Sequence, residues 1–259
     1  MLDEQLSQRF LAVAGPAIEL AKQKKTKLAL LTLEKVDIDQ AFEPDLYHLV
    51  EIQKAALLEL LEKEKPAKML RNFDTVLMLY RAVPMDNKTV YRSAQMQLAN
   101  LLINLKRVDE LEQLYQDFVA QQKLDGEDKL FLSSVLISLN KLDEALKILD
   151  SITHREGATI FATAKTNAAL ILKNLKRYQE CIRTCTLVSA DDDMHMYAKA
   201  QLIWAEALYR LGRREEAFEV YKRLRPFHQP FYSEARWQLF IKFPVRAIRE
   251  NILAFFGKA

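Results

Sequence analysis

Leu105-Lys106-Arg107-Val108-Asp109-Glu110-Leu111 is the first of four similar stretches in this chain. The others read LNKLDEA at 139–145, LKRYQEC at 175–181 and LGRREEA at 211–217. Each begins with leucine, passes through a short basic turn, and continues with an acidic pair, Gln-Glu in the third copy, before a small or apolar residue. The leading leucines lie 34, 36 and 36 residues apart, and a fainter copy reads LRNFDTV at 70–76. Spacing of this length indicates a repeat protein.

The charges in each copy predict helix, tight turn, helix. Acidic residues are favoured in the first turn of a helix and basic residues in the last turn, because of the helix dipole. Three further series keep the same spacing and predict packing positions where two helices cross. They are Ala99, Ser133, Ala169 and Ala205 before the turn, Leu111, Ala145, Cys181 and Ala217 after it, and the larger Tyr115, Leu149, Cys185 and Tyr221 four positions on.

The composition agrees with a helical protein and excludes several classes. The 259 residues are 50% hydrophobic and 28% charged, which suits a folded chain with a sizeable core. Only 5 glycines and 7 prolines are present, too few for the many turns of an all-β domain. The glycine positions cannot form a glycine-rich phosphate-binding loop. Two cysteines do not make a disulfide framework.

The repeated stretches resemble the tetratricopeptide repeat (TPR), a helix-turn-helix unit of 34 residues. The resemblance covers about 92–226; it is weaker over 43–84, where the first helix is longer and Pro66 opens the second. Another copy is expected at 10–42, with Ala17 and Ala29 in the small positions, then Leu33 and Val36. The sequence departs from the family in having Ala or Ser for the first-helix Gly and in mostly lacking the closing Pro.

The resemblance implies an all-α, right-handed superhelical solenoid of about six helical hairpins with two C-terminal capping helices. We expect degenerate N-terminal repeats over 1–84, four TPR-like repeats over 85–230, and capping helices over 231–259. Terminal units in such stacks are atypical because they cover an otherwise exposed core.

No residue cluster predicts catalysis, a metal or a cofactor. Cys181 and Cys185 lie four apart on one helix, but they occupy packing positions and have no nearby partners to complete a metal site. Asp191–Asp193 lacks the spaced oxygens of a calcium loop and is expected to cap the next helix. The four histidines, His48, His154, His195 and His228, are scattered singly. We therefore expect a protein that is not an enzyme.

The family binds partners on the concave face lined by the first helix of each repeat. Residues at fixed offsets from the small positions are expected to face this concave surface and to form a protein-binding groove. Several of them carry side-chain amides, which can hydrogen-bond to a peptide backbone. The alternative is that these polar side chains are merely solvated. The selected residues are Met96, Asn100, Asn104, Ser134, Ser138, Thr166, Lys173, Asn174, Glu206, Tyr209 and Arg210. The lysine that opens the carboxylate clamp of chaperone-binding TPR domains is absent from the corresponding positions, so that mechanism is disfavoured.

The charge distribution does not predict a nucleic-acid partner. Residues 198–259 carry 12 basic and 6 acidic groups, a net of +6, against −3 for the remainder. Solvated helix faces account for this charge, since no aromatic interleaving or reader motif accompanies it. The apolar last helix, with Val245, Ile248 and Phe255, caps the final repeat, and any exposed remainder could support weak self-association or an envelope contact.

The expected function is a non-catalytic scaffold or adaptor that binds a protein segment in the groove. The alternative is a peptide-sensing regulator whose repeats change conformation on binding, with 10–84 as its output half. No stretch reaches the length needed to span a bilayer, and no export signal is recognised. A cytoplasmic location is therefore favoured; the alternative is a soluble periplasmic domain excised from a longer, anchored protein.

Overall fold

The computed structural model describes residues 4–65, 72–120 and 124–224, and also residues 235, 237, 238 and 241–243. Twelve α-helices, one short 3-10 helix (η1) and a few helical residues between 235 and 242 account for all the regular secondary structure of these residues, so the prediction of an all-α fold is confirmed. Their bounds are α1 Glu4–Lys22, α2 Thr26–Glu34, α3 Pro44–Glu64, α4 Asp74–Arg81, α5 Lys88–Leu105, α6 Val108–Val119, α7 Gly126–Ser138, α8 Leu142–Asp150, η1 His154–Glu156, α9 Ala158–Asn174, α10 Tyr178–Cys185, α11 Met194–Arg210 and α12 Arg214–Arg223.

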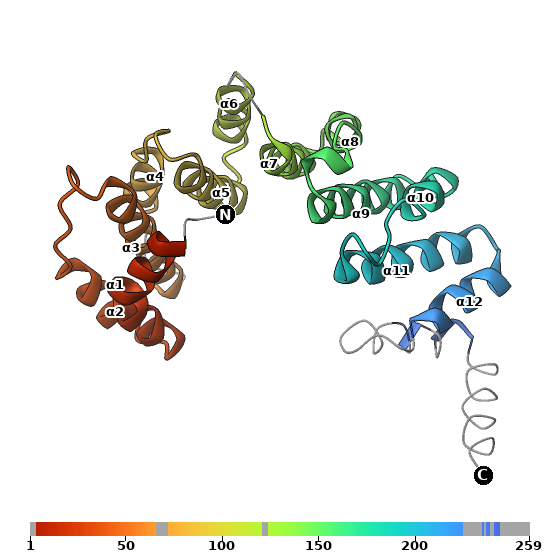
Figure 1. Cartoon of the computed structure of the whole chain (residues 1–259), viewed down its shortest axis with the longest axis horizontal. Coiled ribbons are helices and arrows are strands. Elements are labelled where there is room, and N and C mark those ends of the chain that lie inside the picture. Colours follow the sequence, from red (N-terminus) through yellow and green to blue (C-terminus); the bar gives the residue numbers. More distant parts are fainter. Residues whose placement is uncertain are drawn as a thin grey trace, which may run out of the picture. The chain divides into compact units, whose positions relative to one another are not determined.

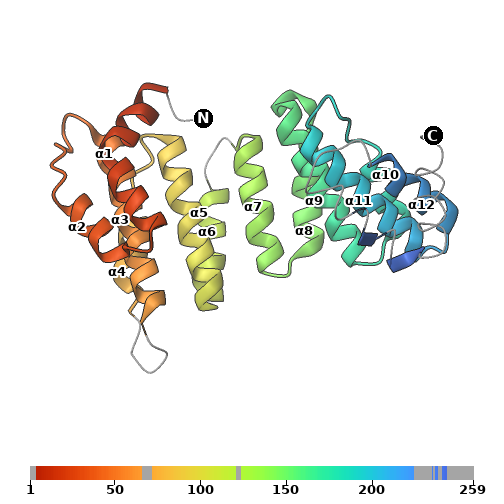
Figure 2. The same ribbon diagram turned by 90° about the horizontal axis from the view of Figure 1, so that it is seen from below.

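The chain forms two compact units, Met1–Leu114 and Tyr115–Ala259. In the first unit α1 packs on α2 and both contact α3, which in turn packs on α4 and α5. In the second unit α7 pairs with α8, α9 with α10, and α11 with α12 (Figures 1 and 2). The elements therefore follow one another as helical hairpins, as the repeats predict. The division expected at residues 84 and 230, by type of repeat, stays a prediction.

The turns within the hairpins share one backbone conformation that the sequence pattern did not reveal. Lys106, Asn140, Lys176 and Gly212 each follow the leading leucine, and each has a positive φ, between 57° and 77°. After the turn at Lys176, the Arg177 amide donates to the Leu172 carbonyl at 2.9 Å, and equivalent bonds close the other three turns. This is the Schellman arrangement that ends a helix with one left-handed residue.

The N-terminal hairpin has the same turn, with Lys24 at φ 60° and the Lys25 amide donating to Leu20. Counted from Lys24, the two small positions fall on Ala17 and Ala29, and the larger one falls on Leu33. All three side chains are fully buried. The α1–α2 hairpin is thus built like the later repeats, as expected for 10–42.

The predicted packing positions form the core. Eleven of the twelve are buried, and Tyr115 is half-buried against the same core. Cys181 and Cys185 are free thiols with no exposed surface, which confirms their assignment to the core. Small side chains at these positions let the helix axes approach closely, so each hairpin packs tightly on the next.

The second hairpin and the C-terminal region match the prediction in part. Helix α3 is 21 residues long, which confirms the expected longer first helix. The described part of its partner helix, α4, begins at Asp74, and Pro66 lies outside the described residues. Of the capping helices, only Ala235, Trp237, Gln238, Ile241 and Lys242 are described as helical, and 244–259 lie outside the described residues.

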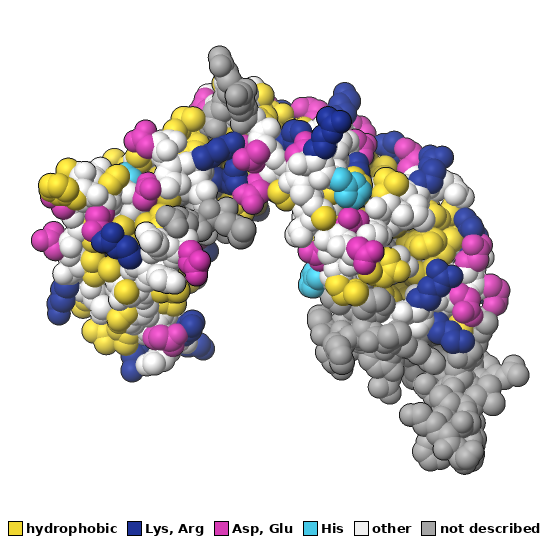
Figure 3. Space-filling model, in the orientation of Figure 1, with side chains coloured by type: hydrophobic (Ala, Val, Ile, Leu, Met, Phe, Trp, Pro, Cys, Tyr) yellow, Lys and Arg dark blue, Asp and Glu magenta, His cyan; other side chains and the backbone are white. Residues whose placement is uncertain are grey.

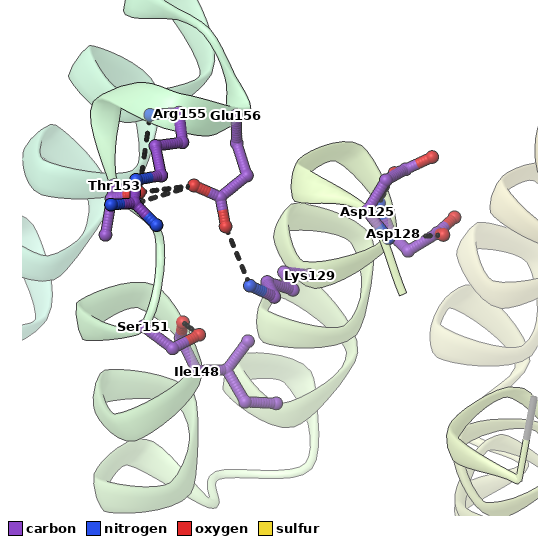
Figure 4. A network of polar contacts seen from close by, with 8 residues as sticks. All are labelled: Asp125, Asp128, Lys129, Ile148, Ser151, Thr153, Arg155 and Glu156. Carbon is purple, nitrogen blue, oxygen red and sulfur yellow. Dashed lines mark hydrogen bonds and ion pairs between the residues drawn. The ribbon is translucent and has the colours of Figure 1, made fainter. Parts of the chain in front are cut away.

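A polar network joins α7 to the segment before α9 (Figure 4). Asp125 and Asp128 cap the start of α7 reciprocally, with bonds of 2.9 and 3.0 Å between each side chain and the other's amide. One turn later, Lys129 Nζ lies 2.9 Å from Glu156 Oε1, while Glu156 Oε2 accepts from the Thr153 amide and hydroxyl. The network fixes α7 beside η1, where Gly126 is also buried.

Candidate functional site

The first helices of the second unit form a continuous row. Helix α9 contacts both α7 and α11, while α8 packs on α9 and α10 packs on α11. Side chains of α7, α9 and α11 that point away from the second helices therefore lie on one surface, called here the first-helix face of this unit. Of the predicted groove residues, those from Ser134 onward belong to this unit, and Met96, Asn100 and Asn104 belong to the first.

On α5 of the first unit, Met96, Asn100 and Asn104 are all exposed. Met96 is an apolar side chain that retains 46% of its surface. Within the described residues, neither asparagine amide has a hydrogen-bond partner in the protein. Each can therefore donate and accept toward a bound main chain.

On α7, Ser134 and Ser138 are exposed, but their hydroxyl protons are already used. Ser134 Oγ donates to the Phe131 carbonyl at 2.7 Å, and Ser138 Oγ donates to the Ser134 carbonyl at 3.0 Å. Such back-bonding is usual for serine within a helix. These two residues can therefore offer only acceptor oxygens to a partner, which is less than the sequence suggested.

The assignment of Thr166 to the groove is wrong. Its side chain has no exposed surface, and its hydroxyl faces the Met196 carbonyl at 3.4 Å. The counting rule places this position on the open face, but α11 packs against α9 and covers it. Thr166 is therefore part of the contact between successive first helices.

The remaining predicted residues lie on α9 and α11. Asn174 and Arg210 are exposed, while Lys173, Glu206 and Tyr209 are half-buried. Glu206 accepts from Arg210 Nε at 2.9 Å and from the Tyr221 hydroxyl at 3.4 Å. Tyr209 meets the ring of Phe243 edge-on at 5.7 Å. Polar and aromatic groups are therefore gathered at the end of the row nearest α12.

The structure adds Lys242 and Tyr221 to this surface, which sequence reasoning missed. Lys242 Nζ forms an ion pair with Glu206, lies 3.1 Å from the Tyr221 hydroxyl, and sits 4.9 Å from the centre of the Tyr209 ring. Together with Lys173 and Arg210 they line a pocket of about 390 Å³. The available signal was the position of Lys242, one residue after the apolar Ile241 in the C-terminal segment.

The titratable groups elsewhere have structural roles. Asp193 caps α11 by accepting from the Met196 amide at 2.9 Å, as predicted for the acidic triplet. The pKa of Cys185 is raised, because its thiol is hydrogen-bonded to Cys181 and buried. His154 stacks on Phe161 and contacts Asp192 at 3.1 Å, His48 is buried beside Tyr47, and His228 lies outside the described residues.

Within the described parts of the chain, no three histidine, cysteine or carboxylate side chains are grouped as metal ligands would be. No helix among them is both long and apolar enough to cross a bilayer. Figure 3 shows Lys and Arg interspersed with Asp and Glu over the described surface that is visible in this view. Of the basic C-terminal residues, Arg213 pairs with Glu216 at 2.5 Å, and Arg225, Arg236, Arg246 and Arg249 lie outside the described residues.

Comparisons with known proteins bear on the fold alone. No family model matches the chain, and no curated protein matches it in sequence. Among solved structures, the crystal structure of the apo form of RapI superposes with a TM-score of 0.50 at 10% sequence identity. The alignment covers 95% of this chain and 86% of that one. The chain is therefore an all-α, helical-repeat protein similar in fold to RapI.

Proposed function

We propose that this protein is a non-catalytic scaffold or adaptor that binds a protein segment along its first helices. The main support for this proposal comes from Asn104 and Asn174, which occupy the same position in two repeats. Both amides are exposed, and neither has a hydrogen-bond partner among the described residues, whereas the small positions five residues earlier, Ala99 and Ala169, are buried. The helices thus bury one side and leave peptide-like groups unpaired on the other.

A preformed surface of this kind binds without reordering the receptor, which lowers the entropic cost of association. The packed hairpins supply the required rigidity, because each one is held by its neighbours. Extended backbone is the natural ligand for unpaired amides, since its N–H and C=O groups match their acceptor and donor. These features support a protein or peptide partner.

A paired pull-down tests the proposal. The wild-type chain is compared with the double variant Asn104→Ala/Asn174→Ala and with the matched control Gln116→Ala/Gln179→Ala. The control removes two exposed amides from the second helices α6 and α10. We expect a partner to be retained by the wild type and the control but lost from the Asn variant. Equal retention by all three would place binding elsewhere and overturn the proposal.

A second candidate function is a regulator whose conformation responds to a peptide. It is favoured by the division of the chain into two compact units at Leu114 and Tyr115. RapI, the structural neighbour, was solved in its apo form, that is, without a bound ligand. Small-angle scattering with and without the captured partner separates the two functions. A ligand-dependent change in radius of gyration supports the regulator, and an unchanged radius supports the scaffold.

A further inference from the structure

The pocket of about 390 Å³ in the second unit has an excess of positive charge. Among the residues that the structure describes, its charged lining consists of Lys173 from α9, Glu206 and Arg210 from α11, and Lys242. Of these described groups, three are cations and one is a carboxylate, a net charge of +2. Tyr221 from α12 supplies a hydroxyl on the same wall.

Glu206 cannot neutralise this group of cations. Its carboxylate is already shared by Arg210, Tyr221 and Lys242, and only 20% of its side chain is exposed. Lys173 has no ion pair among the residues that the structure describes. Within the described part of the chain, the pocket therefore contains one ammonium group without a counter-ion and a second that shares its counter-ion with a guanidinium group.

The two lysines lie close enough to influence each other. Lys242, whose side chain is 12% exposed, has its pKa lowered to about 8, because burial and the charge of Lys173 both disfavour its protonated form. Like charges facing one another in a partly desolvated pocket repel, and an anion bound between them removes this repulsion. The pocket that the two lysines line is thus suited to a negatively charged group.

We propose that this pocket binds a carboxylate of the protein segment held by the first-helix face. The partner then carries an aspartate or glutamate side chain where it passes Lys173 and Lys242. The inference rests on the proposed function. Lysine and arginine donors form charge-assisted hydrogen bonds with a carboxylate, which are stronger than those between neutral groups. Glu206 holds Lys242 in place at one side of the pocket.

This pocket differs from the carboxylate clamp expected by resemblance. Residues Met96, Leu130, Thr166 and Leu202 occupy the clamp's first-lysine position, and none of them is charged. Lys173 is instead four residues after the small position Ala169, and Lys242 comes from the segment after the last hairpin. The cations therefore meet only because Lys242 and Phe243 pack beside α11 and α12.

Lysine NMR with ¹³Cε labelling tests the inference on the full chain. The probes are the capped peptide acetyl-(Gly-Ser-Glu)3-amide, its Gln counterpart, and sodium glutarate as a free carboxylate. We expect the Glu peptide to shift the signals of Lys173 and Lys242 and to raise the pKa of Lys242 above about 8. The Gln peptide is expected to leave both unchanged, and glutarate to bind more weakly.

Two variants sharpen the test. Lys173→Met is expected to weaken binding of the Glu peptide about tenfold, as loss of one charge-assisted contact predicts. Lys147→Met removes an equal charge from an exposed position on α8 and is expected to bind as the wild type does. Thermal unfolding of both variants, and of Lys173→Gln, shows whether any loss reflects misfolding.

Several results would overturn the inference: equal binding of the Glu and Gln peptides, undiminished binding by a folded Lys173→Met, or glutarate binding as tightly as the peptide. The last result would identify a site for small anions. The outcome is independent of the pull-down. If binding of a partner requires Asn104 and Asn174 but not Lys173, the proposed scaffold function is supported and the proposed carboxylate-binding pocket is refuted.

Discussion

The first and second helices of the hairpins differ in how their surfaces are used. Helices α9 and α11 are 17 residues long, whereas α10 and α12 have 8 and 10 residues. At the starts of the second helices α10 and α12 an arginine pairs with the glutamate three positions on. Arg177 contacts Glu180 at 2.6 Å and also Asp143 of the preceding hairpin at 3.5 Å, and Arg213 contacts Glu216 at 2.5 Å. On α9, Lys173 and Asn174 have no such partners among the described residues.

The difference indicates a division of roles. Ion pairs at the start of the second helices satisfy their own charges, so those helices hold the repeats in register and present a solvated face. Unpaired polar groups on the first helices remain available to a partner. The second helices and the packing positions therefore stabilise the fold, whereas the open face of the first helices remains available for recognition.

The largest expected effect concerns the packing positions. Ala169 has no exposed surface, so Ala169→Leu forces three extra carbon atoms between helices and is expected to lower the free energy of unfolding by about 2–3 kcal/mol. The matched control is Ala158→Leu, at the exposed start of the same helix α9. Urea denaturation measures both. Equal stability of the two variants would show that the α9 position is not a close helix contact.

The second prediction compares a glycine in a close contact with a glycine that has open space around it. A Cβ at Gly126 would lie 2.8 Å from both Glu156 Cβ and Ile160 Cγ2, so Gly126→Ala is expected to cost about 1–2 kcal/mol. A Cβ at Gly15, within α1, would have no neighbouring atom within 4 Å. Gly15→Ala is therefore expected to raise the free energy of unfolding by about 0.8 kcal/mol. Unfolding midpoints measured by circular dichroism test the pair. Changes of the same sign would contradict it.

The hairpin turns offer a finer test of the repeats. Lys176 and Gly212 occupy the same left-handed position, with φ of 62° and 77°. Because a side chain disfavours this conformation, Lys176→Gly is expected to stabilise by about 0.5–1 kcal/mol and Gly212→Ala to destabilise by a similar amount. Urea unfolding of each single variant provides the measurement. If Lys176→Gly were destabilising, the side chain would have to be making a contact that outweighs the strain.

These comparisons show what sequence spacing could predict. The periodic series at Ala99, Ala145 and their equivalents predicted the core, because packing positions are imposed on every repeat alike. The burial of Thr166 was missed, because the spacing of residues within one repeat does not show how closely the next first helix, α11, packs on α9. The pocket at Lys242 was missed for a related reason, since it depends on how a non-repeating segment returns to α11 and α12.

The smallest effect is expected in acid, at the network that joins α7 to η1. The pKa of Glu156 is lowered to about 2, because Thr153 and Lys129 bond to its carboxylate. A carboxylate with a lowered folded-state pKa contributes stability that is present above its unfolded value and is lost as the pH falls toward 2. Glu156→Gln is therefore expected to make the decline in stability below about pH 4.5 shallower.

Urea midpoints measured between neutral pH and pH 2 provide the test. Glu144→Gln is the control, since it removes an exposed carboxylate that has no ion pair among the described residues. That variant is expected to follow the wild-type profile in acid. Parallel profiles for all three proteins would mean that the bonds to Glu156 do not contribute to folding. The contact between α7 and the segment before α9 would then depend only on the close approach of Gly126 and Ile160.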